Sequence, residues 1–225
     1  MTTTYLAADW DRLGSTFLEA IGDTLVMVSV TMIIGGLLVL VIGVLLYTTR
    51  SGGVLQSKPV YWVLNVLVNF IRPIPFIIMI AMFAPLTLSV VGTTIGRSAA
   101  IFIMCIAAAF AVARIVEQNL VAIDPGVIEA ARAMGAGPWK IISTVILPEA
   151  LGPLVLGYTF IFIAVVDMSA MAGYIGGGGI GDFAIVYGYR AYDLEVTYAS
   201  VIVIVIIVQI AQLLGNWLSR KILRR

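Results

Sequence analysis

The chain has 225 residues, of which 61% are hydrophobic and 11% are charged, and its formal net charge is +1. A soluble domain carries about 25% charged residues. The composition therefore excludes an ordinary soluble fold and predicts that lipid surrounds much of the chain. The small net charge gives no indication of nucleic-acid binding, and the sequence has no histidine, the commonest metal ligand. Cys105 is the single cysteine, which excludes an internal disulfide.

Five apolar stretches are long enough to cross a bilayer, because a spanning helix needs about 20 mostly apolar residues. They predict an all-α membrane protein with five transmembrane helices in a single transmembrane domain, residues 1–225. The stretches run approximately over residues 21–47, 60–88, 95–116, 151–172 and 196–218.

The distribution of lysine and arginine predicts the orientation of these spans, since cytoplasmic loops carry an excess of both. One set of connections holds Arg50, Lys58, Arg132, Lys140, Arg220, Lys221, Arg224 and Arg225, and the other holds Arg12, Arg97 and Arg190. The richer set is predicted to be cytoplasmic, so the N-terminus is expected outside and the C-terminus in the cytoplasm. The loop after the fourth span, residues 173–194, is then extracellular.

The cytoplasmic loop between the third and fourth spans, residues 122–149, is predicted to fold as a helix–turn–helix. Asp124 can cap a helix that begins at Pro125, because the fixed φ of proline suits the first helical position. Gly135 can end that helix in the left-handed conformation. This first helix therefore has a defined start and a defined end.

Prolines divide the rest of the loop. Gly137 and Pro138 interrupt it before a second short helix, which is expected to run towards Ile146. Pro148 is expected to break the chain once more before the fourth span. A solvated hairpin without a partner is the alternative interpretation, but the loop is longer than a tight connection requires.

The same loop carries a resemblance to a known family. It resembles the EAA loop of ABC-importer permeases, whose pattern is E-A-A-x3-G-x9-I-x-L-P. The matching residues are Glu129, Ala130, Ala131, Gly135, Leu147 and Pro148, with Val145 where the pattern has isoleucine. Other segments, among them IRPIPFII, VGTTIG, SAMAG and GGGGIGD, resemble the methionine-uptake permeases, and the likeness extends from Leu18 onward.

The resemblance implies a multi-pass subunit of the bacterial cytoplasmic membrane that forms a homodimer around a central pathway. Two ATPase subunits are expected on the cytoplasmic side, and an extracellular substrate-binding protein or lipoprotein on the other. Each EAA loop would lie in a groove of an ATPase subunit, with Glu129 making a polar contact and Gly135 holding the turn. ATP-driven closure of the ATPase pair would then switch the pathway from inward-facing to outward-facing.

The chain has no Walker A sequence and no candidate catalytic triad. It is therefore not expected to be an enzyme or to bind a cofactor or a metal itself. ATP and magnesium are expected on the partner ATPase, and no nucleic acid is expected as a partner.

Four residues in or near the spans are candidates for the pathway. Met171 matches the methionine that the family places at the constriction, where a flexible thioether can seal a pore. Met168 lies one turn away, and ordinary core packing is the alternative for both methionines. Asp167 is a carboxylate inside a span, which is costly and usually faces a cavity or a partner. It is expected to pair with Arg72 or to line the pathway, and hydration near the outer interface is the alternative.

Two further residues, Arg114 and Glu117, lie three apart near the cytoplasmic end of the third span and are predicted to pair.

The extracellular loop contains the run GGGGIG, residues 176–181. Gly176, Gly178 and Gly181 fit the G-x-G-x-x-G pattern of dinucleotide sites. An apolar helix rather than a strand is predicted before them, on the outer face, so a nucleotide site is disfavoured. Gly176 to Gly179 are instead predicted to break the helix, and the glycines of the run are predicted to form a close-packed turn or a hinge of the outer gate. A short return helix is expected to start at Asp182.

Alternatives to methionine import remain. The first is an ABC permease for another small solute, such as a different amino acid or a dipeptide. A secondary transporter or channel that works without an ATPase is the second, although internal repeats and relay charges, which that class often shows, are not evident here. The third is a membrane scaffold without transport activity.

Overall fold

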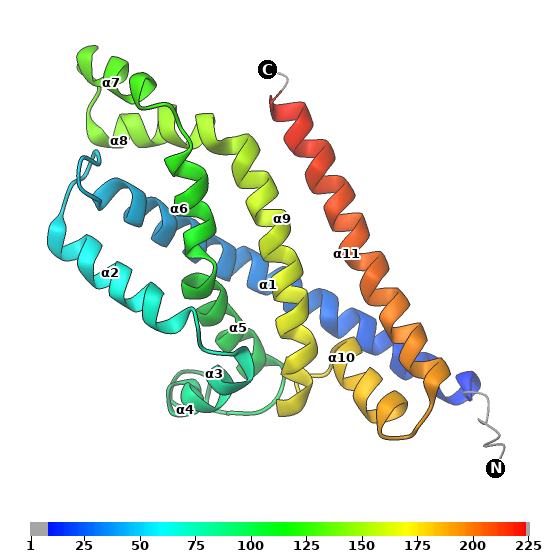
Figure 1. The fold of residues 1–225 in the computed structure, drawn as a ribbon. Helices are drawn as coiled ribbons and strands as arrows, with labels where there is room; N and C mark the ends of the chain where they lie inside the picture. Colours follow the sequence, from blue (N-terminus) through cyan, green and yellow to red (C-terminus); the bar gives the residue numbers. More distant parts are fainter. Residues whose placement is uncertain (1–8, 224–225) are drawn as a thin grey trace. The chain divides into compact units, whose positions relative to one another are not determined.

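The computed structural model describes residues 9–223, and every regular element among them is helical (Figure 1). The predicted all-α class is confirmed. The chain groups into two compact units. The first unit holds the described residues up to Ile34, Pro75–Ile106 and Phe162–Ala211, and the second holds Gly35–Ile74, Ala107–Ile161 and the described residues from Gln212. Arg224 and Arg225, which enter the charge pattern, lie outside the described residues.

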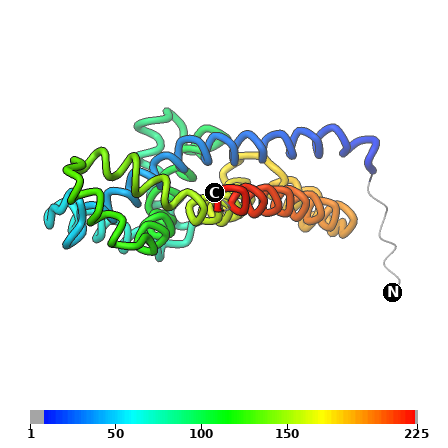
Figure 2. The backbone as a smooth tube through the Cα atoms, turned by 90° about the horizontal axis from the view of Figure 1, so that it is seen from above, coloured from blue at the N-terminus to red at the C-terminus, as the bar shows by residue number. Residues whose placement is uncertain are grey.

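Among residues 9–223, four helical segments are long and apolar enough to cross a membrane. They are Trp10–Thr49 (α1), Arg97–Val121 (α5, Arg97–Ala111, and α6, Ala113–Val121), Pro138–Ile175 (with α9, Leu147–Ala172) and Leu194–Leu223 (α11). Each segment contributes residues to both units. Figure 2 follows α1 and α11 as uninterrupted coils.

The remaining predicted span is interrupted in the structure. It consists of α2 (Lys58–Ile71) and α3 (Phe76–Met82), which together are long and apolar enough for a fifth span. The sequence predicts one stretch over residues 60–88, but Pro73 and Pro75 interrupt the helix because each lacks an N–H and disfavours the α conformation before it. The short helix α4 (Ala84–Val91) follows and ends at Gly92, whose φ is +82°.

Helix α1 begins at Trp10, well before the predicted start at Ile21. A hydrophobic cluster of the first unit covers this extension, and it consists of Trp10, Leu13, Phe17, Ala20, Phe183 and Val196. The indole Nε1 of Trp10 also donates a hydrogen bond to Glu195 Oε1 at 2.8 Å. Tertiary packing of an amphipathic face thus carries the helix beyond its apolar stretch.

The core of the second unit joins α1, α2 and the α5–α6 segment. Its buried members Leu46, Val68 and Ala113 pack with the partly buried Ile42, Tyr61, Leu64 and Phe110.

The helix–turn–helix predicted for the cytoplasmic loop is formed in the second unit by α7 (Pro125–Ala133) and α8 (Pro138–Ile141) (Figure 1). The break predicted at Pro148 is wrong. A π-helical turn, η1 (Ile142–Ile146), joins α8 to α9, and the N–H of Leu147 donates to the Ile142 carbonyl five residues back. Pro148 lies just after this π-helical turn, and the helix continues through it into α9.

The glycine-rich loop of the first unit follows α9. It passes through a 3-10 turn, η2 (Gly173–Ile175), the helix α10 (Gly179–Phe183) and a π-helical segment, η3 (Ala184–Tyr189). The predicted return helix therefore exists but begins at Gly179, three residues before Asp182. It begins there because Gly178, at φ +74° and ψ −157°, adopts a conformation that essentially only glycine reaches. The hydroxyl of Thr24 then accepts a hydrogen bond from the Ile180 N–H at 2.8 Å.

Candidate functional site

Both ends of helix α7 are fixed by the chain itself. Asp124 Oδ1 accepts a hydrogen bond from the Gly126 N–H at 2.8 Å, which confirms the predicted cap. At the other end the Gly135 N–H donates to the Arg132 carbonyl at 2.9 Å, and the next N–H donates to the Ala131 carbonyl at 3.1 Å. This pair of bonds is a Schellman motif, and it uses the left-handed φ of +79° at Gly135. Helix α7 is therefore short, and both of its ends are fixed by hydrogen bonds.

The residues of the EAA pattern face different surroundings. Ala131 is only 4% exposed. It lies where α7 packs against α8 and η1, whose Ile141 and Ile142 are also buried. Glu129 and Ala130 are exposed. One side of α7 thus holds the helix to the fourth span, while the other side leaves its side chains on the surface of the chain.

The last two residues of the pattern stand where the loop enters α9. Leu147 is half-buried and Pro148 is exposed. Just beyond them, the Gly152 carbonyl accepts a hydrogen bond from Ser219 Oγ at 3.1 Å. Leu223 packs so closely that a Cβ on Gly152 would lie 2.5 Å from it. The start of α9 is therefore tied to the end of α11.

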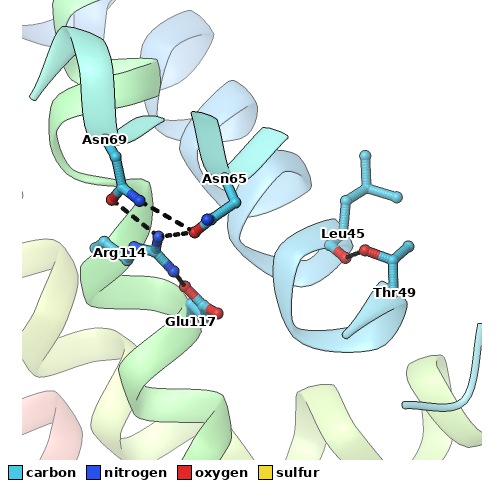
Figure 3. Close-up of polar contacts among 6 residues, drawn as sticks. All are labelled: Leu45, Thr49, Asn65, Asn69, Arg114 and Glu117. Atoms are coloured by element: carbon cyan, nitrogen blue, oxygen red, sulfur yellow. Dashed lines mark hydrogen bonds and ion pairs between the residues drawn. The ribbon is translucent and has the colours of Figure 1, made fainter. Parts of the chain in front are cut away.

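Four polar side chains form a hydrogen-bonded cluster between α2 and α6 in the second unit (Figure 3). Arg114 donates to Glu117 and to Asn65, and its Nη2 also donates to Asn69 Oδ1 at 3.0 Å. Glu117 is buried and Arg114 is partly buried. The predicted pairing of Arg114 with Glu117 is confirmed. Sequence reasoning missed the two asparagines, although their spacing of four residues on an apolar helix was the available signal.

The three candidate pathway residues of α9 lie in the first unit. Asp167 is exposed, Met168 is half-buried and Met171 is 36% exposed. Between the methionines, Ser169 is buried, and its hydroxyl donates to the Val166 carbonyl at 2.7 Å. Met171 is therefore not a core residue of the single chain. Its place at a constriction stays a prediction.

Arg72, the proposed partner of Asp167, directly follows α2 and is exposed in the second unit. Because Asp167 belongs to the first unit, the pairing of these two residues stays a prediction.

The glycine-rich loop is packed too tightly for side chains at several positions. A Cβ on Gly181 would lie 2.3 Å from Ala170 Cα, and one on Gly179 would lie 2.8 Å from Thr24 Oγ1. Positive φ angles of +69°, +74° and +89° occur at Gly176, Gly178 and Gly179. A helix rather than the strand of a dinucleotide site precedes these glycines. The geometry favours the close-packed turn over the hinge.

Comparison with known proteins adds an independent observation to this geometry. The family described as "Binding-protein-dependent transport system inner membrane component" matches residues 40–225. The chain belongs to this family. The matched region includes both the α7–α8 loop and the glycine-rich loop, and so contains the capped helix and the close-packed turn described above.

Relatives within this permease family extend over nearly the whole chain. The probable D-methionine transport system permease protein MetI of Vibrio cholerae is 40% identical over 216 residues, which are 96% of each chain. The methionine import system permease protein MetP of Bacillus subtilis is 40% identical over 181 residues, 80% of this chain and 82% of that protein. A chain of the MetNI methionine ABC transporter, solved in inward-facing conformations, is 39% identical and superposes with a TM-score of 0.90, covering 94% of this chain and 98% of its own.

Proposed function

We propose that this chain is the membrane-spanning permease subunit of an ATP-driven importer whose substrate is methionine. The observation that carries the proposal is the 40% identity, over 96% of both chains, to a permease named for D-methionine transport. The likeness to a chain of a solved methionine transporter at a TM-score of 0.90 supports the same assignment.

In this proposal two copies of the chain surround one pathway in the bacterial cytoplasmic membrane. The N-terminus lies outside and the C-terminus in the cytoplasm, an orientation supported by the basic residues around Arg50, Arg132 and Arg220. The glycine-rich loop then lies on the outer side, where a binding protein delivers the substrate. The α7–α8 loop faces the cytoplasm, where two ATPase subunits bind ATP and magnesium.

Coupling of ATP hydrolysis to transport requires a rigid connection that moves the spans together with the ATPase subunits. Helix α7 suits this task because it is capped at both ends and is packed on the turn that continues into α9. We assign Glu129 to a polar contact with the ATPase groove and Gly135 to the turn that shapes the docking surface. Glu129 is the fifth residue of α7, and no acidic residue lies in the first turn of this helix, so the helix dipole does not account for its presence.

The pathway is proposed to pass the end of α9 in the first unit. Met171 is placed at the constriction, because its flexible thioether can seal a pore and repack when the pore opens. Asp167 either lines this pathway or pairs with Arg72. If they pair, a charge-swap double variant should recover the uptake that each single variant loses. Failure to recover would leave the pathway role of Asp167.

The experiment that tests the function is uptake of labelled methionine by cells that depend on this chain and on its ATPase. Gly135→Asp and Glu129→Lys are each expected to lower uptake at least about tenfold, a loss of about 1.4 kcal/mol of coupling, while the chain still reaches the membrane. Gly22→Ala, an exposed helical site where a Cβ meets no atom within 4 Å, is the control. Wild-type uptake in both loop variants would contradict the docking model.

One observation favours a second candidate, a permease for another amino acid. All amino acids share the ammonium group that the Asp167 carboxylate can bind, so this residue does not restrict the substrate to methionine. Competition of methionine uptake by other amino acids, together with the ligand measured on the cognate binding protein, separates the two candidates.

A further inference from the structure

We propose that the ATPase partner binds two segments of this chain, helix α7 and the loop between α1 and α2. Together these segments bind an acidic side chain of the partner. The inference rests on the proposed function, since it names a contact within the same assembly. It is carried by a cavity in the second unit that both segments line.

The cavity has a volume of about 100 Å³ and is open to the surface. Its charged lining consists of Arg50 from the α1–α2 loop and of Glu129 and Arg132 from α7. Two positive side chains and one negative side chain therefore line the same small space. The excess positive charge favours an anionic ligand.

The two arginines have hydrogen-bonding capacity left over. Neither forms an ion pair with a carboxylate in the described part of the chain, although Glu129 shares the cavity with both. The guanidinium of Arg50 lies over the Tyr47 ring at 4.3 Å. Arg132 Nη2 makes one long hydrogen bond, of 3.5 Å, to the Gly52 carbonyl. Because each guanidinium has five donors in a planar fork, both can still bind a carboxylate.

The α1–α2 loop holds Arg50 in place because it is folded back on the end of α1. The N–H groups of Leu55 and Ser57 each donate at 3.0 Å to a carbonyl in the last turn of α1. A Cβ on Gly53 would lie 2.1 Å from the Thr48 carbonyl oxygen, so only glycine permits this approach. A loop that is already ordered loses little conformational entropy when a partner binds.

The arrangement also specifies the partner surface. A carboxylate that enters between Arg50 and Arg132 would lie near Glu129, so a basic group beside that carboxylate is needed to avoid repulsion. An acid flanked by a base therefore fits, whereas an isolated acidic cluster does not. Inorganic phosphate shares the anionic chemistry, and the experiments below distinguish it from a protein side chain.

The first experiment measures retention of the ATPase subunit by the affinity-tagged chain at increasing salt. The double variant Arg50→Gln/Arg132→Gln is expected to weaken retention about tenfold and to flatten its salt dependence, because two charged contacts are lost. Lys58→Gln removes one positive charge outside the cavity and is expected to behave as wild type. Unchanged retention in the double variant would overturn this inference and leave the proposed function standing. Absence of any retained ATPase with the wild-type chain would overturn both.

The second experiment keeps the charge and so does not depend on a disruptive variant. Arg132→Lys places a primary amine in the cavity, and a zero-length carbodiimide reagent joins an amine only to a carboxylate in direct contact. We expect mass spectrometry to find Lys at this position linked to an Asp or Glu of the ATPase subunit. A link to Glu129 of the same chain, or no link to the ATPase, would overturn the inference. Loss of the link on addition of inorganic phosphate alone, with the ATPase still retained, would identify a simple anion site instead.

Discussion

The glycine-rich loop of the first unit and the α7–α8 loop of the second unit both contain glycines, but their glycines have opposite surroundings. In the first, an added Cβ would lie within 3.0 Å of another atom at Gly173, Gly177, Gly178, Gly179, Gly181 and Gly188. In the second, a Cβ on Gly135 or Gly137 would meet nothing within 4 Å. The glycine-rich loop is held by close packing on backbone and side-chain atoms, whereas α7 is held by hydrogen-bonded caps that leave several of its side chains on the surface. The first loop is therefore expected to tolerate no added side chain at these glycines, whereas the second loop has room for one at Gly137.

The sharpest test of this contrast is one substitution made in both loops. Gly181→Ala places a Cβ 2.3 Å from Ala170 Cα, and because backbone atoms cannot move aside, we expect a loss of more than about 3 kcal/mol and poor recovery of folded chain. Gly137→Ala meets no atom, and Gly137 has a φ of −71°, so its unfolding temperature should match wild type. The measurement is thermal unfolding of the purified chains in detergent. Equal unfolding temperatures for the two variants would break the contrast.

The second test compares an ion pair from each unit. Arg114–Glu117 is largely buried, whereas Arg97–Asp23 has an arginine side chain that is 45% exposed. Glu117→Gln leaves the Arg114 charge without its carboxylate in a buried place, and we expect a loss of about 3 kcal/mol. Asp23→Asn is expected to cost less than about 1 kcal/mol, because water screens the exposed pair.

Both variants are measured by chemical unfolding in one detergent. A larger loss for Asp23→Asn than for Glu117→Gln would show that burial does not decide the strength of these pairs. Glu117→Asp, which keeps the charge, is the control for side-chain shape.

The sequence was sufficient to predict the features of this fold that depend on residues close together in the chain. Each of these features follows from a fixed spacing within a single helix. The structure has the cap at Asp124, the left-handed Gly135 and the pair Arg114–Glu117. The apolar stretches and the composition were sufficient for the all-helical class.

The errors arise where contacts distant in sequence decide the structure. Helix α1 starts early because Trp10 and Phe17 pack against residues near 183 and 196. The chain does not break at Pro148 because a π-helical turn, which no residue pattern predicts, precedes it. The asparagines at 65 and 69 join Arg114 across more than 40 residues of sequence. The cavity beside α7 likewise depends on the distant loop at residues 50–54.

A smaller effect is expected from the helix caps of the two units. Asp124 caps the nine-residue helix α7, and Asp193 Oδ1 accepts a hydrogen bond from the Val196 N–H at 3.1 Å at the start of α11. Removal of either cap costs about 1 kcal/mol. For Asp124→Ala the loss should be local, because α7 is short and exposed, and hydrogen exchange should accelerate in α7 alone. Asp193→Ala should instead lower the unfolding temperature of the whole chain. Global destabilisation by Asp124→Ala would show that the α7–α8 loop is not an independent element.

The smallest expected effect is a change in stability at acid pH, which arises from the burial of Asp182 in the glycine-rich loop. Burial raises the pKa of the Asp182 carboxyl above its ordinary value of 3.8, and the positive charge of Arg190 offsets part of that rise. The Asp182 carboxyl therefore binds its proton more tightly in the folded chain than in the unfolded chain. The stability that this protonation contributes is complete below pH 3.8 and is lost as the pH rises through the raised pKa. Asp182→Asn removes the titration, so above that window the variant should be slightly more stable than wild type, with a flatter dependence of unfolding temperature on pH. Parallel pH profiles for the two proteins would mean that Asp182 is hydrated in the folded chain and that its loop is less closed than the packing of Gly181 indicates.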